Sequence, residues 1–148
     1  MKKLLTLSNI LKASAALLGI IAFVMMFTKQ LWIGNSSNKA FVDFKDALFD
    51  KDFGSAISFV GYLFLLIGGL GMCALVFLKD KKIVKLLAMC LAGALLLGAI
   101  FVFIEAAVVN GRIDSSLIKY NLTAGPVFAG IFGILAALLG CGSEFLKK

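Results

Sequence analysis

Four long runs without a charged residue constrain this chain more than any other feature. They cover residues 13–28, 55–78, 86–104 and 120–143, which together make 83 of the 148 residues. Each run is close to the roughly 20 apolar residues that a helix needs to cross a bilayer. The chain is 61% hydrophobic and 16% charged, whereas soluble domains are about 45–50% apolar and about 25% charged. The sequence therefore predicts an all-α integral membrane protein, a four-helix bundle forming a single transmembrane domain over 1–148.

The distribution of lysine predicts how this bundle is oriented. We expect spans at about 10–30, 55–78, 83–109 and 121–145, with an outer loop at 31–54. Nine lysines fall on the side of the termini and second loop, against six Lys or Arg residues in the first and third loops. Because the side richer in Lys and Arg stays inside, we expect cytoplasmic N- and C-termini and a plasma-membrane location. The ratio of 14 lysines to one arginine favours a bacterial cell membrane.

The outer loop 31–54 holds the clearest pattern outside the predicted spans. Asn38 is a suitable N-cap and Gly54 a suitable C-terminal stop for a helix between them. At 100° per residue, Phe41, Phe44 and Leu48 lie opposite three aspartates of the same loop. We expect a short amphipathic helix whose apolar face, formed by these three residues, lies against lipid or the bundle.

Small residues recur at helical spacing in two of the spans. They are Gly125, Ala129, Gly133, Ala137 and Cys141 in the last span, and Cys90, Ala94 and Gly98 in the third. Stripes of this kind let transmembrane helices approach one another closely. We predict that these eight residues are helix-packing positions. The pattern fits packing within one bundle and packing between protomers equally well.

Several classes of function find no support in the residues. The chain has no histidine, which removes imidazole as a metal ligand or general base. Cys73, Cys90 and Cys141 all lie in apolar runs, where cysteine is generally an inert hydrophobe, although a thiolate metal site or acylation is the alternative. We expect no catalytic, cofactor-binding or metal site and no enzymatic activity. The lysines flank the spans and form no continuous basic face, so we expect lipid rather than nucleic acid as their partner.

Ionisable residues also argue against coupled transport. Lys12 and Lys85 fall at the inner edge of their spans, where a lysine can extend its amine to the interface. Glu105 belongs at the outer interface, 22 residues after Ile83 or about 33 Å of helix. The sequence predicts a non-enzymatic multi-pass protein with a structural, accessory or interaction role, whose partner is another membrane protein or a second copy. A small oligomeric channel or transporter is the alternative.

This layout resembles the claudin and peripheral-myelin-type tetraspan families, and also small bacterial four-span proteins. The resemblance rests on four spans, a longer first outer loop holding Trp32, and a last span entered through Ala124-Gly125-Pro126. It implies the layout alone, because Trp32 is followed by Ile33-Gly34-Asn35 and by no pair of cysteines in the loop. The first loop is also too short for the extracellular sheet of the claudin family.

Overall fold

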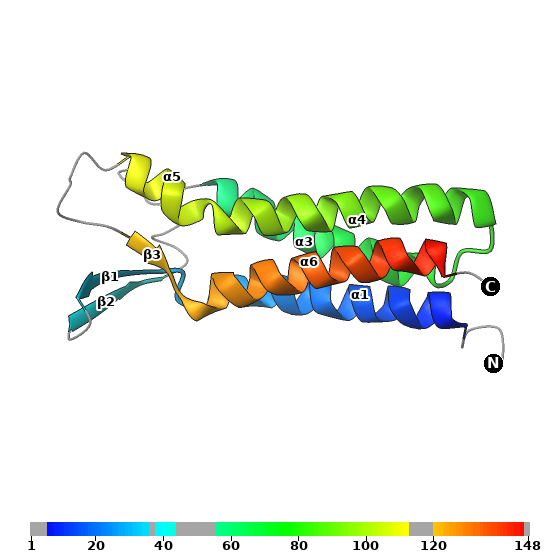
Figure 1. Ribbon diagram of the computed structural model, residues 1–148, viewed down its shortest axis with the longest axis horizontal. Coiled ribbons are helices and arrows are strands. Elements are labelled where there is room, and N and C mark those ends of the chain that lie inside the picture. The colour runs from blue at the N-terminus through cyan, green and yellow to red at the C-terminus, as the bar shows by residue number, and fades with distance from the viewer. Residues whose placement is uncertain (1–5, 36–37, 44–55, 113–119, 147–148) are drawn as a thin grey trace.

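Four long helices carry the apolar runs in the computed structural model, which describes residues 6–35, 38–43, 56–112 and 120–146 (Figure 1). They are α1 (Leu7–Val24), α3 (Ala56–Leu75), α4 (Lys81–Phe103) and α6 (Ala124–Phe145). A short 3-10 helix, η1 (Met25–Phe27), extends α1, and α5 (Glu105–Arg112) follows α4. All four long helices are long and apolar enough to cross a membrane. The predicted span 83–109 covers parts of two helices, because the chain turns at Ile104.

Local signals in the sequence explain where these helices begin. The hydroxyl of Thr6 accepts a hydrogen bond from the backbone N–H of Asn9 at 3.3 Å and so caps α1. The carboxylate of Asp80 accepts from the backbone N–H groups of Lys82 and Ile83 and caps α4. Both side chains satisfy N–H groups that have no partner within a helix. Pro126 lies in the first turn of α6, where its missing N–H costs no helical hydrogen bond.

The four helices form a closed ring in the order α1, α3, α4, α6. Each packs against its two neighbours in the ring and makes few contacts with the helix opposite. The start of α1, the end of α6 and the α3–α4 turn lie at one end of the bundle, called here the terminal end (Figure 1). The other end carries three strands and is called the sheet end. Both ends of the described chain are therefore on the same side of the bundle.

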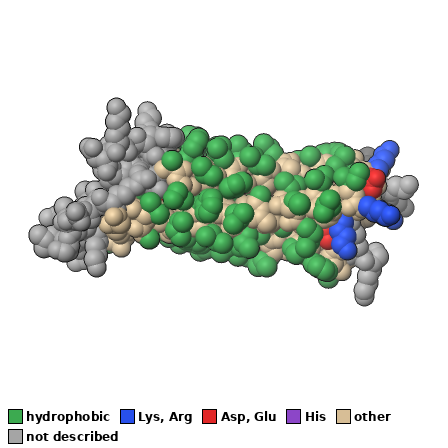
Figure 2. Space-filling model, turned by 90° about the horizontal axis from the view of Figure 1, so that it is seen from above, with side chains coloured by type: hydrophobic (Ala, Val, Ile, Leu, Met, Phe, Trp, Pro, Cys, Tyr) green, Lys and Arg blue, Asp and Glu red, His purple; other side chains and the backbone are tan. Residues whose placement is uncertain are grey.

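Burial follows the ring closely. The interior is filled by fully buried side chains that include Tyr62, Leu65, Met72 and Leu95. The outward faces carry leucines and isoleucines that are more than half exposed, namely Leu17, Ile67, Leu86 and Leu138. Figure 2 shows hydrophobic side chains covering the middle of one face, with the described charged side chains gathered at the terminal end. An apolar exterior of this extent suits hydrocarbon rather than water.

A three-stranded antiparallel sheet stands at the sheet end. The predicted all-α class therefore describes the four-helix bundle but leaves out this sheet. The strands are β1 (Leu31–Asn35), β2 (Asn38–Val42) and β3 (Tyr120–Leu122), in the order β2-β1-β3. Two residues link β1 to β2, and β3 comes from the segment before α6. Because a different loop supplies the third strand, the length of the first loop does not limit the sheet.

The predicted amphipathic helix was wrong where the structure describes it. Asn38–Val42 form β2, paired with β1 in the register Trp32↔Phe41 and Asn35↔Asn38. The backbone of this segment forms hydrogen bonds with the neighbouring strand β1. This pairing outweighed the helical spacing of the phenylalanines in the loop. Phe41 is 54% exposed. Phe44 and Leu48 lie outside the described residues.

Glycines mark the closest approaches between the helices. A Cβ at Gly19 of α1 would lie 2.9 Å from the Cα of Gly69 in α3. On the other side of α3, a Cβ at Gly98 of α4 would lie 2.6 Å from the carbonyl oxygen of Gly61. Real Cβ atoms do not come this close to backbone, so α3 is held between α1 and α4 by contacts that only glycine permits.

Replacing Gly98 with alanine is expected to lower the free energy of unfolding by about 1–3 kcal/mol, because the added methyl group pushes α4 away from α3. Gly93→Ala is the matched control on the same helix, since a Cβ there would meet no atom within 4 Å. The control is expected to raise stability by up to about 1 kcal/mol through helix propensity. Denaturant unfolding in detergent micelles, followed by circular dichroism, compares the two. Equal effects of both substitutions would contradict the close approach.

Candidate functional site

Buried polar side chains gather at the two ends of the bundle. At the sheet end they are Gln30, Ser58, Tyr62, Glu105 and Thr123, called here the sheet-end cluster. At the terminal end, Lys12 of α1 and Glu144 of α6 are joined by an ion pair that also involves Ser8. The middle of the bundle between them is apolar. These two groups are the candidates for function.

Gln30 is the centre of the sheet-end cluster and is fully buried. Its side-chain Nε2 donates to the carbonyl oxygens of Met25, Met26 and Thr28, at 3.2, 2.8 and 2.9 Å. These carbonyls belong to the end of the first span, where a helix lacks enough backbone partners for its last carbonyl groups; that of Met25 also accepts from the N–H and the hydroxyl of Thr28. Its Oε1 accepts a hydrogen bond of 2.8 Å from the hydroxyl of Tyr62 on α3. One amide thus closes the end of the first span and ties it to α3.

The backbone of the same residue holds the sheet to the bundle. The N–H of Gln30 donates to the carbonyl oxygen of Val42 in β2, and its carbonyl oxygen accepts from the N–H of Thr123, both at 3.0 Å. The Thr123 hydroxyl donates to the carbonyl oxygen of Lys29. Because Thr123 is the N-cap residue of α6, the sheet is connected directly to the first and last spans. The sheet is therefore a fixed extension of the bundle.

Glu105 belongs to the same cluster; it lies two residues beyond the end of α4 and is fully buried. Among the described residues, neither of its carboxylate oxygens has a hydrogen-bond partner within normal distance and angle, and the same holds for the hydroxyl of Ser58 close by. Burial raises the pKa of Glu105 from 4.5 to about 7, while the nearby Ser58 hydroxyl lowers it by a smaller amount. The carboxyl group therefore carries a proton for part of the time near neutral pH.

The terminal end contains a buried ion pair that the sequence analysis misses. The Nζ of Lys12 lies 2.7 Å from Oε1 of Glu144, and both side chains are almost completely buried, at 2% and 0% exposure. Lys12 also donates to the hydroxyl of Ser8 at 3.1 Å. The sequence predicted that Lys12 extends its amine to the interface. Its ammonium group is instead buried, because Glu144 provides a partner inside the bundle. The pair joins α1 to α6.

The predicted packing residues fall in different environments. Ala129, Gly133 and Ala137 of α6 are buried, whereas Gly125 and Cys141 are half-buried. A Cβ at Gly133 would lie 2.7 Å from a side-chain carbon of Leu65 and 3.0 Å from the Cβ of Ala99. On α4, Gly98 is buried, Ala94 is half-buried and Cys90 is exposed. The buried small residues of this helix that the pattern misses are Ala88, Ala92 and Ala99.

The three cysteines do not come together at a common site. Cys73 and Cys90 are exposed on the outside of the bundle, and Cys141 is half-buried with its sulfur 3.7 Å from that of Met89. Within the described ranges, no group of three or more His, Cys, Asp or Glu residues is placed to hold a metal ion.

Comparison with known proteins finds no relative of this chain. The chain matches no protein family model, no curated protein sequence and no solved structure.

Proposed function

We propose that this chain is a multi-pass protein of the plasma membrane that acts by contact with another membrane protein, as an accessory or structural subunit without enzymatic activity. Four helices long and apolar enough to span a bilayer support the membrane location. The excess of lysine on the side of the termini supports cytoplasmic termini. In this orientation the sheet end faces outward.

The fixed sheet is the observation that carries the contact role. Gln30 and Thr123 connect the sheet to the first and last spans through backbone hydrogen bonds of 3.0 Å. Within the described residues, β2 pairs with β1 alone, so its other edge can add a strand or receive a side chain from a partner. Phe41 stands on this strand at 54% exposure, and exposed aromatic residues on rigid elements commonly anchor interfaces. A rigid strand edge that carries an exposed aromatic residue suits binding of a partner protein better than catalysis.

The packed interior favours this role over the alternative of a small channel or transporter. Tyr62, Leu65, Met72 and Leu95 fill the axis of the bundle and are fully buried. A conducting pathway through a single bundle would need to displace these side chains. The alternative would therefore require a pathway between several copies of the chain.

Photo-crosslinking in intact cells tests the contact role. A photoreactive phenylalanine analogue placed at Phe41 is expected to give a crosslinked product of one discrete, higher mass. The same analogue at Phe128, a similarly exposed phenylalanine on α6, is the matched control and is expected to react with lipid. A Phe41→Asp variant is expected to lose co-purification with the crosslinked protein while keeping its own expression level. Absence of a discrete product at Phe41, together with ion flux through liposomes containing the pure protein, would favour the channel.

A further inference from the structure

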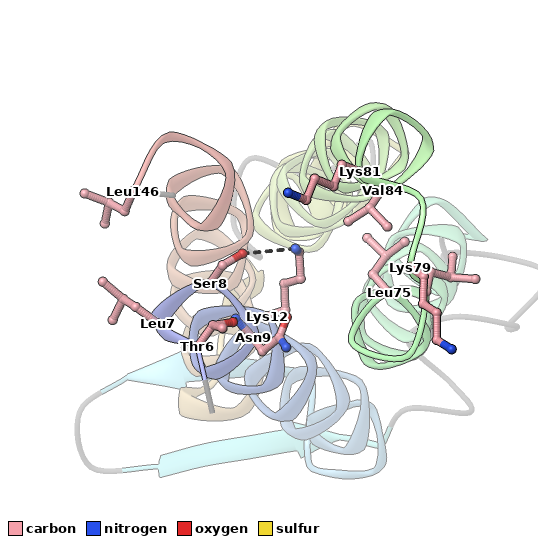
Figure 3. A pocket seen from close by; sticks show the side chains of 11 residues that line it. Thr6, Leu7, Ser8, Asn9, Lys12, Leu75, Lys79, Lys81, Val84 and Leu146 are labelled. Atoms are coloured by element: carbon pink, nitrogen blue, oxygen red, sulfur yellow. Dashed lines mark hydrogen bonds between the residues drawn. The ribbon is translucent and has the colours of Figure 1, made fainter. Parts of the chain in front are cut away.

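A pocket of about 480 Å³ opens at the terminal end of the bundle and takes no part in the contact role (Figure 3). Its polar lining comes from Thr6, Ser8, Asn9, Lys12, Lys79 and Lys81, on α1 and around the α3–α4 turn. Its apolar lining includes Leu75, Leu78 and Val84. We propose that this pocket binds an anionic phosphate group, carried by a phospholipid headgroup or free in the aqueous phase.

The charge of the pocket is the first argument for an anion. Lys12 lies at its floor, where Glu144 neutralises it at 2.7 Å. Lys79 and Lys81 lie at the rim and are exposed. Neither lysine forms an ion pair with a described residue. The carboxylate of Asp80 between them is engaged as the cap of α4. The two lysines outnumber the single carboxylate of Asp80, so among the described residues the rim keeps a net positive charge.

The arrangement of donors is the second argument. Figure 3 shows the ammonium group of Lys81 extending over the opening between the helices, above the ammonium group of Lys12, while that of Lys79 turns outward. The Ser8 hydroxyl accepts from Lys12, so its own hydrogen is available to donate. An ammonium group and hydroxyl donors around one opening suit the several acceptor oxygens of a phosphate.

The position of the pocket favours a lipid as the source of the phosphate. Leu7 and Leu78 at its border are at least half exposed and point away from the bundle core. A ligand in this place would meet charged groups on one side and apolar side chains on the other, as a phospholipid does at the interface of the membrane. This source depends on the proposed orientation in the membrane, whereas binding of free phosphate does not.

Native mass spectrometry of the full chain in detergent tests the pocket with three probes: phosphatidylglycerol, phosphatidylcholine and inorganic phosphate. Phosphatidylglycerol is expected to bind as one retained molecule, with phosphatidylcholine at least about tenfold weaker. The double variant Lys79→Ala/Lys81→Ala is expected to lose about tenfold in affinity for phosphatidylglycerol. Lys82→Ala is the matched control, because Lys82 is exposed beside Lys81 but does not line the pocket. It is expected to bind as the wild type does.

Each remaining outcome decides the proposal. Retention of inorganic phosphate with the same dependence on Lys79 and Lys81 would assign the pocket to the free ion. Equal retention of the two lipids would overturn the proposal, because binding would then not depend on the charge of the headgroup. An equal loss in the Lys82→Ala control would overturn it in favour of diffuse attraction between lysines and lipid. The crosslinking at Phe41 takes place at the opposite end of the bundle, so the two proposals can fail independently.

Discussion

Replacing Lys12 with methionine is expected to lower the free energy of unfolding by about 3–5 kcal/mol, because the substitution leaves the Glu144 carboxylate buried without its cation. The two side chains are 2% and 0% exposed and their charged atoms lie 2.7 Å apart. Denaturant unfolding in detergent micelles measures the loss.

Removing both charges is expected to restore much of this stability. A Lys12→Met/Glu144→Leu double variant replaces the pair with apolar side chains, and buried pairs exchanged in this way are often neutral or even stabilising. Lys85→Met is the matched control, since Lys85 is an exposed lysine on α4, and it is expected to change stability by less than about 0.5 kcal/mol. A double variant as unstable as Lys12→Met alone would show that the two residues do not act as a pair.

The second large effect concerns pH and Glu105. Its pKa is 4.5 in the unfolded chain and about 7 in the folded protein, so between these values the folded protein binds a proton that the unfolded chain has lost. The contribution of Glu105 to the free energy of unfolding is fully present below pH 4.5. It is lost as pH rises from 4.5 through about 7. A difference of this size corresponds to about 3 kcal/mol.

A Glu105→Gln variant isolates this contribution, because glutamine has nearly the same shape and does not ionise. Unfolding curves at pH 5, 6, 7 and 8 are expected to show the wild type losing stability relative to the variant, with the largest gap at pH 8. Asp43→Asn is the control, since Asp43 is 59% exposed in a surface ion pair with Lys29, where such pairs contribute little. A wild type that gains stability relative to Glu105→Gln as pH rises would contradict the buried, unpartnered carboxyl group.

The helices of this fold could be predicted from the sequence because each one carries its own signal. Uncharged runs of sufficient length give the spans, and Pro126 indicates where the last one starts. The sheet could not be predicted in this way. Its third strand has three residues, Tyr120–Leu122, and pairs with a strand from the other end of the chain. Nothing local distinguishes such a segment from the start of a span.

The buried polar residues escaped prediction for a related reason. Gln30 is the last residue of the predicted span 10–30, and its four side-chain partners become visible only in three dimensions. Glu144 follows directly after an uncharged run, at the end of the predicted span 121–145. Its distance in sequence from Lys12 hides the pair. A lysine five residues inside a span, with a carboxylate inside another span at the same end, was the available signal.

The ring of helices also sets an order of events during synthesis. The first span depends on the last at both of its ends, since Lys12 pairs with Glu144 and β1 pairs with β3 just before α6. Until the ribosome has delivered α6 to the bilayer, the nascent first hairpin carries an uncompensated cation at one end and an open strand edge at the other. Completion of the fold thus coincides with insertion of its final helix.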